Sequence, residues 1–520
     1  MRITRASGFG IAAALAAACV LAAYSKSIRE YVRVSRGWTV LSVLSAAGIS
    51  WGVMDSFSFE DEVLQTDKIK NILNRSAVFD VGRVVCCIGG IAYISLFVML
   101  FWKKMGGLSA WKKDLFSLTR TETAVYAMLF AASCGYVIYA FSGSVAFYDV
   151  HPYGFLYDAI YSSDSADLLQ PSAYLWPVHA ENDIRQPLFA LFAAPFMGIP
   201  YLISAPFSVS VRAMVTDCAQ AAMLLFANLM IAKAMRLKPF YRICFMVLSF
   251  CMYSNLLFTV MMEQYIIVYF WLAAVVYMFC RKEYHELPML AAGGTLLAGF
   301  ALLPLFPAGR ASSFRDALKA WLMRVGKLLL KYVGLMALFC RFDVIYNLLI
   351  LSRLMLTFTG KDVTFTNRLF QFSEYVRGCF LAPAAGADFT TKKHVAWLMN
   401  PVEGIQILGV VILCLVILSA VISRRKRFAR IAGAWAAFSF AVLAVVGWGT
   451  KENGLILYAL YFGWAYLALL LELVIALCEK AKASFAVGIL SAAACGVMLY
   501  VNIPAVRDLL RFAFEYYPVI

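Results

Sequence analysis

Long apolar segments alternate with short polar ones along the whole chain. Many apolar segments reach the roughly 20 residues that a helix needs to cross a hydrocarbon core of about 30 Å, and none shows the short alternating strands of an outer-membrane barrel. The pattern therefore predicts an all-α, polytopic membrane protein. About twelve transmembrane helices are expected, at residues 8–24, 37–54, 81–102, 122–142, 211–232, 240–259, 265–280, 328–348, 403–423, 429–448, 455–477 and 483–502.

Two further apolar stretches do not fit as simple crossings. Residues 188–207 contain several prolines, which favour a proline-broken juxtamembrane or re-entrant element on the outer side. Residues 288–307 must begin and end on the same side, which favours a broken hairpin around Gly293, Gly294 and Gly299. Broken backbone at membrane depth is tolerated only where protein buries it or where it lines a wet cavity.

The composition agrees with a membrane protein and sets its orientation. Of 520 residues, 63% are hydrophobic and 15% are charged, and the mean hydropathy is +0.77, far from soluble domains. The net charge of +16 is distributed over loops, so nucleic acid is not an expected partner. The positive-inside rule places the basic loops in the cytoplasm and both termini on the outer side of the plasma membrane. These loops are residues 25–36, 103–114, 233–242, 310–331 and 424–430.

The threading divides the chain into four parts. The first apolar segment follows a basic start and resembles a secretory signal, but a second span follows at once, which favours an uncleaved helix. The thirteen cysteines are scattered, mostly in apolar runs, and imply neither disulfides nor a metal cage. The four parts are N-terminal membrane helices (1–121), a membrane core with an acidic outer loop at 143–187 (122–351), a second, basic outer loop (352–402) and C-terminal membrane helices (403–520).

The acidic outer loop carries the residues best suited to catalysis. Aromatic residues and prolines interleave with Asp and His in "FYDVHPYGFLYD" and "WPVHAENDIRQPLF", which favours an ordered cleft at the membrane surface. Asp149 follows the span 122–142 closely, and its carboxylate is a candidate general base. Glu181 and Asp183 are candidate catalytic partners that share a face only on an extended backbone. The candidate substrate-binding residues are His151, Asp158, His179, Arg185, Glu263 and Arg341.

Two of these candidates lie outside the acidic loop. Glu263 is in a tight turn that is expected to surface on the outer side, between the spans 240–259 and 265–280. Arg341 is expected in the outer half of the membrane, where an ionisable group is a functional candidate by default. Ion pairing explains such a residue equally well, since Asp343 is close to Arg341 in the sequence.

A divalent metal is a possible cofactor of the acidic loop. Its oxygen and imidazole donors suit Mg²⁺ or Mn²⁺, although their spacing matches no standard ligand motif. No cofactor is certain from the sequence. The potential ligands are Asp149, His151, His179, Glu181 and Asp183.

The order of these features resembles the GT-C superfamily of membrane glycosyltransferases over about residues 122–300. A span precedes an acidic outer loop with an early aspartate, followed by "DIRQPLFALFAAPF", a span opened by Arg212, and a helix pair turning at "MMEQYIIVYFWLAAVVYMF". The resemblance implies transfer of a sugar from a polyprenyl-phosphate carrier to an acceptor on the outer side, with Asp149 as the base. His151 stands where many members carry a second acid, so Glu181, Asp183 or Asp158 would supply that group.

Three other functions fit part of the pattern. A transporter or flippase of lipid-linked glycans also needs about twelve interrupted helices, but no internal repeat is visible and the ionisable residues gather at one face, Asp217 excepted. A polysaccharide polymerase or ligase would depend on paired arginines, and Arg368 and Arg377 are not an obvious pair. A structural membrane protein would leave the acidic loop unexplained.

Overall fold

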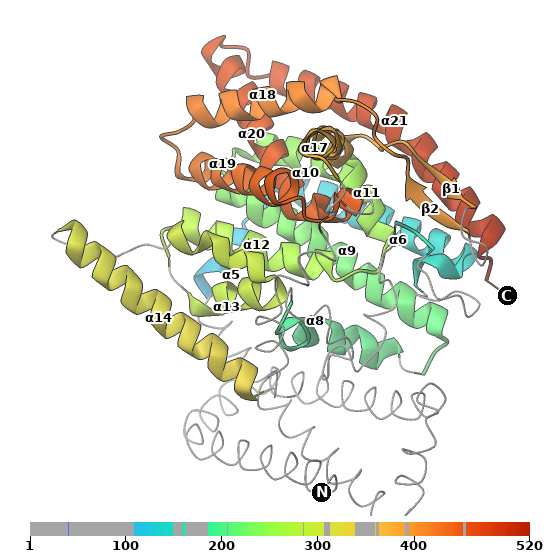
Figure 1. Ribbon diagram of the computed structural model, residues 1–520, viewed down its shortest axis with the longest axis horizontal. Coiled ribbons are helices and arrows are strands. Elements are labelled where there is room, and N and C mark those ends of the chain that lie inside the picture. Colours follow the sequence, from blue (N-terminus) through green and yellow to red (C-terminus); the bar gives the residue numbers. More distant parts are fainter. Residues whose placement is uncertain are drawn as a thin grey trace, which may run out of the picture.

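The computed structural model of the chain is almost entirely helical (Figure 1). It describes residues 109–148, 159–161, 186–204, 206–283, 285–305, 313–338, 363–389, 395–450 and 454–519, together with Val40 and Thr359. The expected spans 8–24, 37–54 and 81–102 lie outside the described residues.

The described part of the chain contains fourteen α-helices. The α-helices are α5 (Ser109–Leu115), α6 (Arg120–Gly143), α8 (Phe189–Ser204), α9 (Val209–Ala234), α10 (Pro239–Cys251), α11 (Tyr253–Val260), α12 (Tyr265–Cys280), α13 (Glu286–Thr295), α14 (Phe314–Leu338), α17 (Phe365–Phe380), α18 (Ile407–Ile422), α19 (Arg427–Ser439), α20 (Ala459–Lys480) and α21 (Ala486–Tyr516). Three 3-10 segments and one π-helical segment accompany them: η1 (Val145–Phe147), η4 (Leu297–Leu305), η7 (Gly454–Tyr458) and η5 (Phe440–Val446). Strands β1 (Ala385–Asp388) and β2 (Ala396–Met399) form an antiparallel hairpin.

Five of the described helices are long and apolar enough to cross a membrane. They are Arg120–Gly143, Val209–Ala234, Arg427–Val446, Leu455–Lys480 and Ala486–Tyr516, and each covers a span expected from the hydropathy pattern. Helices α12 and α18 also lie where spans are expected, but their sixteen residues each extend only about 24 Å. The membrane character and the all-α class are therefore confirmed, while the total of about twelve crossings stays a prediction.

Helix α12 forms the centre of the bundle. All sixteen of its residues are buried, because its sequence is apolar on every side and leaves no polar face for solvent. In Figure 1, α9 and α12 lie in a middle layer, with α17 to α21 on one side and α8 and α13 on the other. The Tyr269 hydroxyl donates to Asn228 Oδ1 at 2.7 Å, so the one polar group on this face of α12 is satisfied by α9.

The expected span 240–259 is two helices bent by 64° at Met252. At the bend, the Cys251 carbonyl is bound by Asn502 of α21, which is fully buried and also binds two backbone groups at the end of α17. Its amide nitrogen donates to the carbonyls of Cys251 and Phe380 at 2.9 and 2.8 Å, and its Oδ1 accepts the Ala382 N–H at 2.8 Å. One side chain thus joins α10, α17 and α21.

The two apolar stretches that do not fit as simple crossings, residues 188–207 and 288–307, differ in structure. Residues 288–307 form the expected broken hairpin, in which α13 and η4 pack against each other; a Cβ on Gly293 would lie 2.3 Å from the Phe300 ring. By contrast, α8 is one continuous helix, and its internal prolines do not break it. Each proline removes one backbone donor and leaves the carbonyl four residues earlier without its helical partner, and α8 stays helical through both Pro195 and Pro200.

The segment 352–402 contains regular structure that hydropathy does not predict. Helix α17 begins at Thr364, whose hydroxyl accepts the Asn367 N–H, and its second half is buried. There Arg377 pairs with Glu374 through two hydrogen bonds of 2.8 and 2.6 Å. Helix α18 approaches it so closely that a Cβ on Gly409 would lie 1.9 Å from the Ser373 carbonyl oxygen, so this position requires glycine.

Segments expected on the same side of the membrane meet in space. At one end, Lys238 pairs with Glu479 at 3.1 Å, and both belong to segments expected inside. At the other end, the Ser144 hydroxyl donates to the Tyr517 carbonyl at 2.7 Å, and both belong to segments expected outside. We refer to these as the inner and outer ends of the bundle.

Labelling of single cysteines tests the crossing of α18. Glu403 and Arg425 are exposed and flank this helix. In intact cells, a membrane-impermeant maleimide should label Glu403→Cys, whereas Arg425→Cys should react only after permeabilisation. The parent chain supplies the background, and labelling of both variants from the same side would refute the orientation.

Replacing Asn502 tests whether its hydrogen bonds stabilise the bend. Asn502→Leu keeps the volume but leaves the Cys251 and Phe380 carbonyls and the Ala382 N–H without this partner. Each unsatisfied buried group costs about 1–3 kcal/mol, so the free energy of unfolding should fall by about 3 kcal/mol or more. Unfolding in mixed micelles measures the change, with the exposed apolar Ile503→Leu as control. Equal stability of the two variants would contradict this role.

Candidate functional site

Most sequence-predicted site residues fall outside the described part of the chain. These are Asp149, His151, Asp158, His179, Glu181, Asp183, Arg185 and Arg341. Their assigned roles therefore stay predictions. Within the described residues, no group of three or more His, Cys, Asp or Glu side chains could hold a metal ion.

Glu263 is described, and its side chain is buried with 1% exposure rather than at the surface. In the turn between α11 and α12, the apolar side chains of Met261 and Met262 are fully buried. The turn therefore lies inside the bundle. Gln220 of α9 donates to the Glu263 carbonyl at 2.8 Å, and Glu263 Oε2 accepts the Gln264 N–H at 3.3 Å. Gln220 is the twelfth of the 26 residues of α9, so this contact fixes the middle of the helix against the turn.

Asp217 lies one helical turn before Gln220 on α9 and is fully buried. Among the residues that the structure describes, neither of its carboxylate oxygens has a hydrogen-bond partner, nor does Gln220 Oε1 or the Tyr136 hydroxyl. Tyr136 of α6 lies within electrostatic reach of Asp217. An ionisable group buried in a membrane bundle is a functional candidate by default. With Asp217, Gln220 and Tyr136, polar side chains continue from the outer end into the bundle interior.

The two outer loops contact each other. Residues 159–161 of the acidic loop are buried, and the Tyr161 N–H donates to the Trp397 carbonyl while the Trp397 N–H donates to the Ala159 carbonyl, both at 2.8 Å. The hydroxyls of Tyr161 and Tyr253 are 2.8 Å apart. Burial raises the pKa of Tyr161, so its hydroxyl remains protonated at neutral pH. The acidic loop is thus bound to the basic loop over α11.

The cations of the basic loop that are described are already engaged. Arg377 is paired with Glu374, and Arg368 donates to the Val445 and Val446 carbonyls at 3.3 Å each. Arg368 and Arg377 therefore serve the packing of α17, and they do not form a pair with each other.

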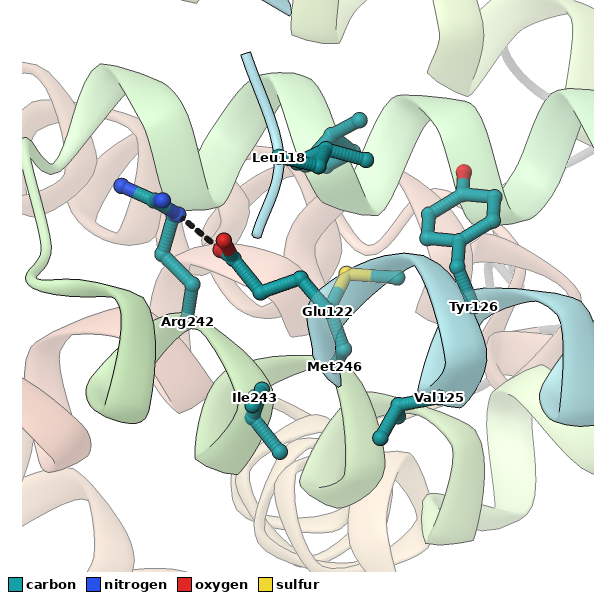
Figure 2. A pocket seen from close by; sticks show the side chains of 8 residues that line it. Leu118, Glu122, Val125, Tyr126, Arg242, Ile243 and Met246 are labelled. Atoms are coloured by element: carbon teal, nitrogen blue, oxygen red, sulfur yellow. Dashed lines mark hydrogen bonds and ion pairs between the residues drawn. The ribbon is translucent and has the colours of Figure 1, made fainter. Parts of the chain in front are cut away.

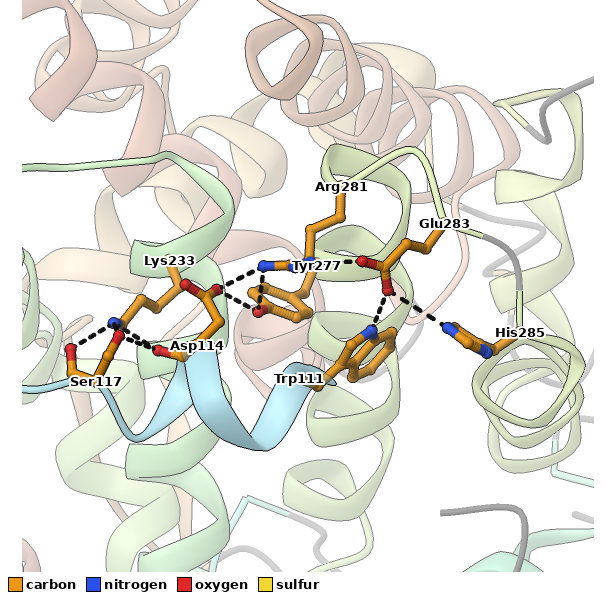
Figure 3. A network of polar contacts seen from close by, with 8 residues as sticks. All are labelled: Trp111, Asp114, Ser117, Lys233, Tyr277, Arg281, Glu283 and His285. Atoms are coloured by element: carbon orange, nitrogen blue, oxygen red, sulfur yellow. Dashed lines mark hydrogen bonds and ion pairs between the residues drawn. The ribbon is translucent and has the colours of Figure 1, made fainter. Parts of the chain in front are cut away.

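A network of polar side chains joins four helices at the inner end (Figure 3). Arg281, which follows α12, donates to Asp114 at 2.9 Å and to Glu283 at 2.7 Å, and Glu283 also accepts from Trp111. Burial opposes ionisation of Glu283, but the hydrogen bonds from Arg281 and Trp111 outweigh it and hold the pKa of Glu283 below its usual value. His285 is 3.4 Å from the same carboxylate.

Lys233 near the end of α9 completes this network. Its ammonium donates to the carbonyls of Asp114 and Ser117 at 2.8 and 2.9 Å and to the Ser117 hydroxyl at 3.0 Å. All three acceptors are uncharged, so these bonds orient the ammonium without neutralising it. The α5–α6 connection is thereby held against α9.

Glu122 and Arg242 form a second charged contact beside the network (Figure 2). The sequence Thr119–Glu122 is a capping box, in which each residue's side chain bonds the backbone N–H of the other. The free oxygen of Glu122 accepts from Arg242 Nε at 2.5 Å, and the two side chains are only 5% and 13% exposed. One carboxylate therefore caps α6 and ties it to α10.

The basic residues of the inner loops indicated orientation, but the arrangement of these loops was not predicted. Acidic and aromatic residues close to basic ones were the available signal: Trp111 and Asp114 lie within the basic loop 103–114, and Glu283 and His285 follow Arg281 and Lys282. Such residues were the sign that parts of these loops pair with one another.

Removing the charge of Glu122 should destabilise the bundle. Glu122→Gln keeps the side-chain shape but leaves Arg242 buried without its counter-ion, which costs about 3 kcal/mol. Glu479→Gln is the matched control, because this pair is exposed: the Lys238 side chain is 72% exposed and that of Glu479 is 44% exposed. Unfolding in mixed micelles should show a large loss for the first variant and almost none for the second. Similar losses would refute a special role for the buried pair.

No family model, curated protein or solved structure matches the chain. The resemblance to the GT-C superfamily therefore depends on the sequence motifs of about residues 122–300 alone.

Proposed function

We propose that the protein is a membrane glycosyltransferase of a bacterial plasma membrane, which moves a sugar from a polyprenyl-phosphate donor to an acceptor on the outer face. The contact between the acidic and basic outer loops carries the proposal, through Tyr161 and Trp397. A lipid-linked donor needs a base for the acceptor hydroxyl and cations for the leaving phosphate. Contact between a carboxylate-rich loop and a cation-rich loop favours such a site.

The surroundings of this contact also support the proposal. The described chain reaches Tyr148, which is buried with its ring 5.5 Å from that of Phe141, so the start of the acidic loop is anchored at the outer end. Asp149 is the next residue and the proposed base. Glu181 and Asp183 are its proposed partners, and a polyprenyl-phosphate tail would lie among the lipids beside the helices.

A transporter or flippase for lipid-linked sugars is a second candidate, because of one observation. Asp217 and Gln220 bury polar atoms without partners in the described chain, as the cavity of a transporter would. Liposomes that contain a fluorescent lipid-linked sugar separate the two functions. A flippase moves the intact lipid between leaflets without an acceptor, whereas a transferase consumes the donor only when an acceptor is present.

Replacing Asp149 tests the transferase directly. Asp149→Asn cannot accept the proton of the acceptor, so turnover of a defined polyprenyl-phosphate sugar should fall by about 10²- to 10⁴-fold. Asp508→Asn is the control, since this carboxylate is half exposed near the outer end of α21. An Asp149→Asn protein that unfolds normally and turns over at a near-normal rate would refute the proposal.

A further inference from the structure

A cavity of about 460 Å³ opens at the inner end of the bundle, among the ends of α5, α9, α10 and α12. Four cationic side chains line it, Lys233, Arg236, Arg242 and Arg281, and Asp114 is the one carboxylate in its lining. Four positive charges and one negative charge leave +3. Its volume lies within the range of small-molecule sites, about 300–1,000 Å³.

Together with Glu122 and Glu283, three carboxylates lie beside the four cations, so the cluster as a whole keeps a net charge of +1. Arg242 is paired with Glu122, and Arg281 with Asp114 and Glu283. Lys233 donates only to uncharged oxygens. Arg236 has no hydrogen bond or ion pair to any side chain in the described ranges.

The backbone does not remove this positive charge. The carboxyl end of α9 contributes roughly half a negative charge near Lys233, which is smaller than the net charge of +1 of the cluster. Arg427 of α19 adds to the positive field, because both Arg236 and Arg427 lie within electrostatic reach of Cys280 in the cavity wall. The cavity therefore favours an anion.

We propose that this cavity binds a phosphate group on the inner side of the membrane, independently of the proposed transferase site. A guanidinium matches two phosphate oxygens at once, and an ammonium binds a third as a point charge. Arg236 and Lys233 supply these two groups, and Arg281 and Arg242 are held beside them by their own carboxylates. Anionic headgroups of the inner leaflet are one source of phosphate, and soluble phosphate compounds are the other.

Binding by the purified full-length chain in detergent tests the site. The probes are inorganic phosphate, short-chain phosphatidylglycerol and, as the phosphate-free reference, short-chain diacylglycerol, with affinity read from the ligand-dependent shift of thermal unfolding. Arg236→Gln should weaken binding of the phosphate probe by about tenfold. Arg236 is exposed, so the variant should fold normally.

The control is Arg425→Gln, which removes the same charge from an exposed inner turn outside the cavity lining. Weaker binding of both anionic probes in Arg236→Gln alone supports a site for soluble phosphate, and weaker binding of phosphatidylglycerol alone supports a lipid headgroup. The proposal is overturned if neither anionic probe binds, if Arg236→Gln binds as tightly as the parent, or if both variants weaken binding equally. Because no sugar donor is used, this test is independent of the transferase.

Discussion

A helix broken inside a membrane bundle must find partners for the backbone groups that it frees, and the arrangement of this protein depends on how the break at Met252 is satisfied. Water is absent there, so each open carbonyl would cost as much as a lost hydrogen bond. Asn502 closes the Cys251 and Phe380 carbonyls together. The bend lets α11 contact α6, α9, α17 and α20 and brings Tyr253 to the Tyr161 hydroxyl at the junction of the outer loops.

Elements whose cause is local could be predicted from the sequence. The apolar length of α6, α9 and α20 is set by the hydrocarbon thickness, so hydropathy places their ends within a few residues. Helix α21 begins near the expected residue but continues to Tyr516, well beyond the expected end at residue 502. The hairpin of α13 and η4 was also predictable, because glycine allows the Phe300 ring to lie against Gly293. In each case the deciding property belongs to the segment itself.

Elements whose cause is a distant partner could not be predicted. Helix α17 is too polar for a hydropathy window, although Leu369, Phe372, Val376 and Cys379 follow a helical period. Asn502 appears in the sequence as one polar residue in an apolar run, and its role requires α10 and α17 to be in place. The burial of Glu263 has the same origin, since the sequence shows a turn but not its depth. For the site, the contacts of residues 159–161 with Trp397 join the two outer loops within the part of the chain that the structure describes.

The two ends of the bundle differ in how their buried charges are compensated, and α9 runs between them. At its inner end, Lys233 belongs to a network in which most charges are paired, and the positive charge that this network leaves over lies at the cavity. Near its outer end, about 24 Å away along the helix, Asp217 is buried with no partner among the described residues. An isolated buried carboxylate charge is far costlier than a paired one, so Asp217 must be either neutral or matched by a group that the described residues do not supply. Both candidate functions meet that requirement, a transporter through its cargo and a transferase through its donor or its outer loop. Asp217 is therefore the described residue whose environment depends most directly on which of the two functions the protein performs.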